Sequence, residues 1–311
     1  MSLRRVVILN PQSRNGLAAR AFERLRGGLQ ELLGKFELVQ TEAPGDCTRL
    51  VRRILTEQSH DQILLAGGDG SINEAVNGYF VDGKLISEAI PLGVINLGTG
   101  GDFFRTLLKL NPKYEAALRD NRFRLVDCGL STLENGHEPR YFINITSIGL
   151  GGDVNRKMKA SSFQSGPAAY FWHSLSALLQ YNPPACRFRI KAESGVWEEI
   201  EGPLVNFFVC NAECSGGGMR WAPGASLEDG LLDLVLVSGA TKSQLIAESS
   251  RIYTGEIAKM SGVRQFLATE VVAYPATPVS QEIDGEIRKI DGQERHEYHF
   301  RVLPKAIPVV L

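Results

Sequence analysis

Three glycine-rich turns, each placed directly after a short apolar run, constrain the fold of this 311-residue chain more than any other feature. The turns cover residues 10–16, 67–71 and 98–102. Each connects an expected strand to a segment with helical periodicity. Glycine allows close backbone approach and positive φ, and the start of a helix presents free N–H groups, so such turns suit phosphate. One turn alone would be equally typical of tight strand-to-helix geometry.

Strands and helices alternate along the first 130 residues. We expect strands over 5–9, 36–40, 62–66 and 91–96, and helices over 17–33, 48–56, 71–79 and 102–110. This alternation is typical of an α/β, Rossmann-like domain with a parallel sheet and helices on both faces. Because parallel strands end at one edge of their sheet, we expect the three turns to lie together there.

The second half of the chain is rich in strands. Strand-like segments cover 140–148, 187–191, 204–210, 231–237, 270–274 and 298–303, with helices expected over 165–180 and 242–253. We therefore predict a C-terminal β-sandwich domain. The predicted domains are 1–130 and 131–311, with the option that the last residues return to the first domain, and the active site is expected in the cleft between the domains.

Composition and charge exclude several classes of protein. Lys and Arg total 34 against 35 Asp and Glu, so the formal net charge of −1 excludes the broad basic surface of nucleic-acid-binding proteins. The five cysteines are scattered and do not predict a disulfide framework. No apolar run approaches the roughly 20 residues of a membrane-spanning helix, and the apolar residues 6–9 are too few for a signal peptide. We expect a cytoplasmic protein.

Two of the glycine-rich turns also carry a carboxylate. Asp69 lies in the second turn and Asp102 ends the third. A carboxylate beside a phosphate is repulsive unless a divalent cation lies between them, so this pair predicts Mg²⁺. None of the turns has the spacing of a P-loop or of the GxGxxG dinucleotide motif.

Four sequence blocks resemble the diacylglycerol kinase catalytic family, which includes bacterial lipid kinases, sphingosine kinases and ceramide kinases. GGDGSINEAVNG at 67–78 is similar to that family's GGDGT-x-NEVxNG motif, and PLGVINLGT at 91–99 with Asp102-Phe103 is similar to its PLGxxPLGTxNDFA block. GGGM at 216–219, AP at 222–223 and DGLLD at 229–233 follow, then IDGE at 283–286. The blocks occur in the family's order, so the resemblance implies an ATP-dependent lipid kinase related in fold to NAD kinases and phosphofructokinases.

The resemblance also implies roles for individual residues. Glu286 would be the general base that takes the proton from the acceptor hydroxyl, with Asp69 as the second catalytic residue. Asp69 and Asp102, with Asp127 as a further candidate, would bind catalytic Mg²⁺. The expected ATP contacts are Asn10, Thr41, Gly67, Gly68, Asp69, Gly70, Ser71, Ile72, Asn73, Glu74, Gly98 and Thr99. A structural cation would be held by the Asp229 side chain and the carbonyls of Ser226 and Leu231.

The chain departs from the family pattern at several positions. Ser71 replaces threonine and keeps the hydroxyl, while Arg14-Asn15 lengthens the first turn. Asn96 stands where proline is common, and Gly101 replaces the asparagine before Asp102. The change at Gly101 removes a hydrogen-bonding side chain from the expected site, which puts the fine geometry of substrate or metal binding in question.

Two other functions stay open. An NAD kinase would share Gly-Gly-Asp-Gly and the two-domain plan, but Asn73-Glu74 and Asp284-Gly285-Glu286 weigh against it. A catalytically silent regulator that binds nucleotide or lipid would fit the loss of the side chain at Gly101. On spacing alone, Asp284-Gly285-Glu286 is typical of a plain hairpin turn, and only the family resemblance favours a catalytic Glu286.

The expected partners are ATP and a lipid alcohol, whose identity no motif defines. A lipid acceptor implies transient, peripheral contact with a membrane surface. A cluster of basic and aromatic residues fits such contact: Arg156, Lys157, Lys159, Phe163, Tyr170, Phe171 and Trp172. The same aromatic residues would equally suit a buried helix face. A homodimer stays an open option.

Overall fold

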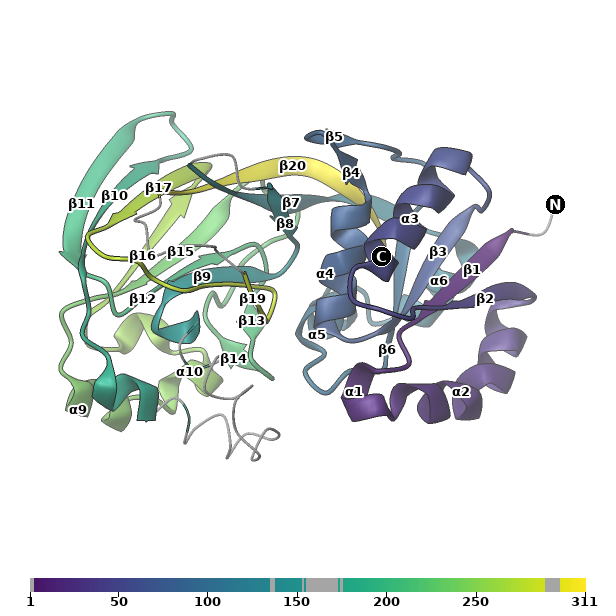
Figure 1. Cartoon of the computed structure of the whole chain (residues 1–311), viewed down its shortest axis with the longest axis horizontal. Coiled ribbons are helices and arrows are strands. Elements are labelled where there is room, and N and C mark those ends of the chain that lie inside the picture. Colours follow the sequence, from purple (N-terminus) through teal and green to yellow (C-terminus); the bar gives the residue numbers. More distant parts are fainter. Residues whose placement is uncertain (1–2, 135–137, 153, 155–172, 174–175, 289–296) are drawn as a thin grey trace. The chain divides into compact units, whose positions relative to one another are not determined.

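The computed structural model describes residues 3–134, 138–152, 154, 173, 176–288 and 297–311. The chain divides into two units (Figure 1). Unit 1 contains Met1–Cys128 and Leu303–Leu311, and unit 2 contains Gly129–Val302. Within the described ranges, the structure has no helix whose length and apolar character would let it cross a bilayer.

Unit 1 is built on the predicted parallel sheet. Its strands are β1 (Arg5–Leu9), β2 (Phe36–Gln40), β3 (Gln62–Gly67) and β6 (Leu92–Asn96). They lie in the order β2-β1-β3-β6, and every pair is parallel. The end of β20 (Tyr298–Val310) extends the sheet, since Val309 pairs in parallel with Leu92. β1 and β3 are buried along their whole length, as expected for a sheet with both faces covered.

Six helices of unit 1 follow these strands. They are α1 (Ser13–Gly16), α2 (Ala18–Leu33), α3 (Asp46–Glu57), α4 (Asp69–Gly78), α5 (Asp102–Leu110) and α6 (Tyr114–Asp120). α3 packs against α4, and α2 packs against α6 (Figure 1). Right-handed crossovers place these two pairs on opposite faces of the sheet, which explains why both faces are apolar. The short hairpin β4 (Phe80–Val81) and β5 (Lys84–Leu85) follows α4.

Unit 2 is the predicted β-sandwich. One layer contains β10 (Ala185–Lys191), β11 (Trp197–Pro203), β17 (Glu270–Pro275) and the first residues of β20, with β7 (Phe123–Leu133) and β8 (Arg140–Phe142) beside them. The other layer contains β9 (Ile145–Gly149), β12 (Asn206–Cys210), β15 (Leu232–Val237), β16 (Val263–Ala268), β18 (Gln281–Ile283) and β19 (Glu286–Ile287). Phe188 and Phe300 from the first layer join Phe207 and Leu234 from the second in one buried cluster.

The six-stranded layer is buried on its outer face as well. Phe208 and Cys210 alternate with Phe207 and join a second apolar cluster. Leu245 and Ile252 pack against that cluster from two short helices. These helices are α9 (Lys242–Ala247) and α10 (Arg251–Thr254); β13 (Cys214–Ser215), β14 (Met219–Arg220) and the 3₁₀ turn η1 (Ile257–Lys259) complete the unit.

Two expected elements of unit 2 are divided in the structure. The strand expected over 140–148 is β8 and β9, because the N–H groups of Ile143 and Asn144 donate to the carboxylate of Asp284 instead of to a neighbouring strand. The helix expected over 242–253 is α9 and α10, because between them the N–H groups of Ser249 and Arg251 donate to the carbonyls three residues back, of Ile246 at 3.3 Å and Glu248 at 3.0 Å, in place of α-helical bonds. The helix expected over 165–180 lies mostly outside the described residues, although 176–180 are helical.

Candidate active site

The three glycine-rich turns of unit 1 lie at one edge of the sheet, as predicted. β1, β3 and β6 are parallel neighbours, so their carboxyl ends coincide. The Asn10 N–H donates to the carbonyl of Ala66 at 2.9 Å, and the Leu97 N–H donates to the carbonyl of Gly67 at 2.8 Å. Residues that leave the three strands are therefore tied to one another. We call this rim, where the sequence predicts phosphate binding, the phosphate edge.

The second and third turns touch backbone to backbone. A Cβ added to Gly98 would lie 2.6 Å from the Cα of Gly68, and one added to Gly68 would lie 3.1 Å from the Cα of Gly98. Backbone atoms cannot give way as the end of a flexible side chain can, so this contact requires glycine on both sides. These two glycines therefore serve the close approach of the turns.

The Asp69 carboxylate joins the second turn to helix α5. Its Oδ2 accepts from the N–H groups of Gly101 at 2.8 Å and Asp102 at 3.3 Å, and its Oδ1 accepts from Phe103 at 3.2 Å. These N–H groups belong to the start of α5, where no carbonyl of the same helix can accept them. Asp69 thus caps a helix from another turn, a role that the sequence analysis did not assign.

A second carboxylate lies beside Asp69. Asp102 is buried, and its Oδ1 accepts from Nη1 of Arg105 at 2.6 Å. A Cβ on Gly100 would lie 2.7 Å from Oδ2 of Asp69 and 3.6 Å from Oδ2 of Asp102, so both carboxylates face this glycine. Mg²⁺ is commonly held by one or two carboxylates together with substrate phosphates, and this pair fits that requirement.

The third predicted magnesium residue, Asp127, is fully buried in β7. Its Oδ1 accepts from the N–H of Lys305 at 2.8 Å. Among the described residues, no three His, Cys, Asp or Glu side chains gather closely enough to hold a metal ion, so Asp127 does not form such a cluster with Asp69 and Asp102.

The first turn is tied to the second by side chains. Nδ2 of Asn10 donates to Oγ of Ser71 at 2.8 Å, and Oδ1 of Asn10 accepts from the N–H of Gln12 at 3.0 Å. Within α4, the Ile72 side chain is buried in the core, and the Asn73 carbonyl accepts from Nδ2 of Asn77. Any contact of Ile72 with a nucleotide would therefore have to involve its backbone.

The predicted nucleotide residue Glu74 caps helix α3. Its carboxylate accepts from the N–H groups of Gly45 at 3.0 Å and Cys47 at 3.3 Å, and its carbonyl accepts from the Thr48 hydroxyl at 2.8 Å. Thr41, directly after β2, is buried and donates its N–H to the carbonyl of Leu9. Glu74 thus fixes the segment between Thr41 and α3, and an effect of Glu74 on ATP would pass through that segment.

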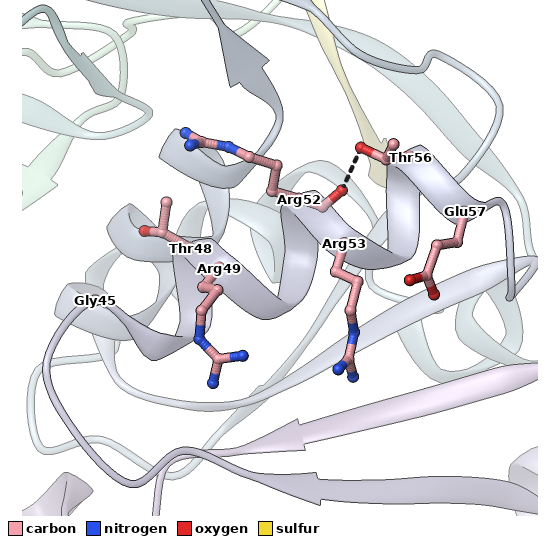
Figure 2. A pocket seen from close by; sticks show the side chains of 7 residues that line it. All are labelled: Gly45, Thr48, Arg49, Arg52, Arg53, Thr56 and Glu57. Atoms are coloured by element: carbon pink, nitrogen blue, oxygen red, sulfur yellow. Dashed lines mark hydrogen bonds between the residues drawn. The ribbon is translucent and has the colours of Figure 1, made fainter.

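A cavity of about 460 Å³ lies along α3 (Figure 2). It is lined by Gly45, Thr48, Arg49, Arg52, Arg53, Thr56 and Glu57. Nη2 of Arg52 donates to the carbonyl of Phe80, and Arg49 pairs with Asp46. This basic face was not among the predicted site residues, although three arginines at helical spacing are a readable signal for it.

In unit 2, the predicted base Glu286 lies at the end of a tight hairpin. β18 and β19 pair through Ile283 and Glu286, and Asp284-Gly285 form the two-residue turn with φ of 46° and 86°. Two positive φ values are those of a type I′ turn, which favours Asp-Gly. Glu286 is exposed. The hairpin expected from the spacing is therefore present, and it is compatible with either role of Glu286.

Asp284 anchors this hairpin. Its Oδ1 accepts from the N–H groups of Asn144 and Ile145, both at 3.0 Å, and its Oδ2 accepts from Ile143 at 3.1 Å. The Asp284 side chain is buried, and its own N–H donates to the carbonyl of Ile145 at 2.9 Å. The turn that precedes Glu286 is thereby fixed to the start of β9.

The predicted structural-cation residues form one turn. Oγ of Ser226 accepts from the N–H of Glu228 at 3.2 Å, and Oδ1 of Asp229 accepts from the N–H of Leu231 at 3.0 Å. Burial, together with the negative charges of Asp229 and Glu213, raises the pKa of the neighbouring Asp233 carboxyl to about 6. A cation bound to this turn would offset that crowding of negative charge.

The last prediction concerns the basic and aromatic cluster that was expected to contact a membrane. The basic and aromatic residues between Arg156 and Trp172 lie outside the residues that the structure describes. Membrane contact through this cluster stays a prediction.

Both halves of the chain match known protein families. Residues 4–130 match the family model described as the diacylglycerol kinase catalytic domain, and residues 144–311 match the YegS C-terminal NAD kinase beta sandwich-like domain. The chain is 28% identical over 290 residues to a diacylglycerol kinase of Staphylococcus saprophyticus, covering 92% of this chain and 90% of the relative. It is 33% identical over 212 residues to a protein of Chromohalobacter salexigens named "probable lipid kinase YegS-like", covering 66% and 63%.

Solved structures show the same fold. A diacylglycerol kinase structure from Bacillus anthracis superposes with a TM-score of 0.65 at 18% identity, covering 99% of this chain and 96% of that one. Yeast NADH kinase superposes with a TM-score of 0.51 at 11% identity, covering 99% and 83%. At these identities the likeness concerns the fold, which two different kinds of kinase share.

Proposed function

Because this chain belongs to the family of diacylglycerol kinases and YegS-like lipid kinases, we propose that it transfers the γ-phosphate of ATP to the hydroxyl of a diacylglycerol-like lipid. The observation that carries the proposal is the phosphate edge. Its two glycine turns touch at Gly68 and Gly98, and two carboxylates face Gly100. α4 begins at Asp69, and the N–H groups at the start of a helix favour phosphate oxygens, which supports the proposal.

In the proposed reaction, the oxygen of the lipid hydroxyl attacks the γ-phosphorus of ATP. The new O–P bond forms while the bond between the γ-phosphorus and the β–γ bridging oxygen breaks, and ADP leaves with that electron pair. The hydroxyl proton passes to the carboxylate of Glu286. The exposure of Glu286 and the anchored turn before it support this role, because a base must reach its substrate and keep its orientation.

We assign the catalytic magnesium to Asp69 and Asp102, whose Oδ2 atoms face the same glycine. Mg²⁺ bound there would neutralise charge on the β- and γ-phosphates during transfer. Asp69 would at the same time hold the start of α5 in place through its three backbone contacts. For the structural cation we propose the turn of Ser226, Asp229 and Leu231, in which Oδ1 of Asp229 accepts from the N–H of Leu231 at 3.0 Å.

We expect Asp69→Asn to raise the Mg²⁺ concentration needed for half-maximal rate by at least about 10-fold, since replacing even an outer-shell partner of a metal ligand typically costs about 10–100-fold in metal affinity. The amide removes one negative charge and presents an NH₂ group to N–H donors of α5, so both the metal and the helix cap lose an acceptor. Initial rates measured over a series of Mg²⁺ concentrations would show the shift. Asp82→Asn, in an exposed turn of the same unit, is the matched control. Equal Mg²⁺ dependence in the two variants would contradict the assignment.

A second candidate function is an NAD kinase-like activity. The shared fold with yeast NADH kinase favours it, since the same phosphate edge would serve a nucleotide acceptor. The match of residues 4–130 to the diacylglycerol kinase catalytic domain favours the lipid. The two functions differ only in the acceptor, so one assay separates them.

The test is transfer of labelled phosphate from ATP to a panel of acceptors. The panel contains diacylglycerol, a sphingoid base and phosphatidylglycerol in mixed micelles, and NAD in solution, with each product identified by mass. We expect a phosphorylated lipid and no labelled NADP. Labelled NADP alone would establish the second candidate. No labelled product with any acceptor, from protein that still binds Mg-ATP, would favour a catalytically silent regulator.

A further inference from the structure

The side chain of Asn96 spans the third glycine-rich turn. Asn96 is the last residue of β6, and its Oδ1 accepts from the N–H of Gly98 at 3.1 Å. Its Nδ2 reaches the other end of the turn, where a Cβ on Gly101 would lie only 2.4 Å away. One amide therefore contacts both the first and the last part of the segment 97–101.

Gly101 leaves room for this amide. Its φ of 65° lies in the left-handed region, which glycine adopts freely and asparagine tolerates better than other residues. Backbone conformation alone would therefore accept asparagine at this position. The obstacle is Asn96, whose Nδ2 occupies the space that a side chain at 101 would enter. Asn96 cannot turn away without losing the hydrogen bond from Gly98.

These contacts connect the two departures from the family motif. The motif that this chain resembles has proline at the position of Asn96 and asparagine at that of Gly101. This chain has the side-chain amide at position 96 and none at position 101. We propose that Asn96 is a positioning residue that replaces the side-chain amide of position 101 and fixes the third turn for the phosphates of the nucleotide. The two substitutions are then one compensated change. The inference rests on the proposed use of this edge for ATP.

Displacement of Asn96 would affect both the predicted magnesium ligand Asp69 and the second glycine-rich turn. The Gly101 N–H donates to Oδ2 of Asp69, so a shift of Gly101 moves a contact of that carboxylate. Gly98 lies against the backbone of Gly68, so a shift of Gly98 moves the second turn. Thr99 and Gly100 lie between these two points. Asn96 therefore acts on nucleotide binding through the backbone of the third turn and not by direct contact with the nucleotide.

The test is a four-way comparison of wild type, Asn96→Ala, Gly101→Asn and the double variant. Gly101→Asn alone should clash with Asn96 and raise KM for ATP about 10-fold, equivalent to roughly 1.4 kcal/mol. Asn96→Ala should raise KM for ATP by a similar factor while kcat changes much less. In the double variant the amide returns to position 101 without a clash, so KM should recover to within about 3-fold of wild type.

A matched control and two further measurements keep the result interpretable. Asn111→Ala removes an asparagine whose Oδ1 likewise accepts from the N–H two residues on, at the other end of α5, and KM for ATP should stay unchanged. Direct Mg-ATP binding and the melting temperature of the unliganded protein are recorded for all variants. Both should show the same recovery in the double variant even if no lipid is phosphorylated, so failure of the lipid assignment is distinguishable. A double variant that is additively worse than either single variant would overturn the inference.

Discussion

Glu286→Gln is expected to reduce lipid phosphorylation by about 10²- to 10⁴-fold, because glutamine cannot take the proton from the acceptor hydroxyl. Glutamine has nearly the same shape, and Glu286 is exposed at the start of β19, so the hairpin should fold as before. KM for ATP should stay within about 3-fold of wild type, since the predicted nucleotide contacts lie on unit 1. Steady-state rates with saturating Mg-ATP and a dispersed lipid acceptor would measure both quantities.

The control for this variant is Glu201→Gln. Glu201 is an exposed glutamate on β11 of the same unit, so its replacement makes the same change of charge in the same unit. Its rate should match wild type. If Glu286→Gln retained the wild-type rate, another group would have to accept the proton, and the catalytic assignment of Glu286 would be wrong even if the lipid assignment held.

The strands β1, β2, β3 and β6 and the four longest helices of unit 1 could be predicted closely because their signals are local. β1 and β3 are apolar on both faces, and α5 has a regular apolar stripe, so burial pattern and periodicity mark their bounds. Unit 2 was harder. β11 is mostly exposed and carries three glutamates, so its place in a sheet depends on its pairing with β10 and not on its own composition.

The chemistry of the site was only partly predictable for a similar reason. A motif shows that Asp69, Glu74 and Asp284 are acidic, but not which groups their carboxylates contact. Each of them accepts backbone N–H groups from a segment 27 to 141 residues away. Asn96 and Gly101 are closer in sequence. Their contact nevertheless depends on the positive φ of Gly101 and on the direction of the Asn96 amide, which the sequence does not show. Contacts of this kind follow from the assembled fold.

Asp284→Ala is expected to lower the free energy of unfolding by about 3–5 kcal/mol, the largest effect on stability that we predict. Three backbone N–H groups, those of Ile143, Asn144 and Ile145, would lose their acceptor in a buried place. Each unsatisfied buried donor costs about 1–3 kcal/mol, and water entering the gap would recover part of that. Urea unfolding followed by fluorescence or circular dichroism would measure the loss.

The control variant Asp82→Ala separates the stability contributed by these hydrogen bonds from the cost of placing alanine at positive φ. Asp82-Gly83 is also a two-residue Asp-Gly hairpin turn, between β4 and β5, with φ of 50° and 78°. Alanine at positive φ costs about 1–2 kcal/mol in either turn, but Asp82 is exposed. The difference between the two variants should therefore reflect the three contacts of Asp284. Asp284→Asn keeps one acceptor oxygen and should fall between them, whereas equal losses for Asp284→Ala and Asp82→Ala would show that the buried carboxylate does not anchor the turn before Glu286.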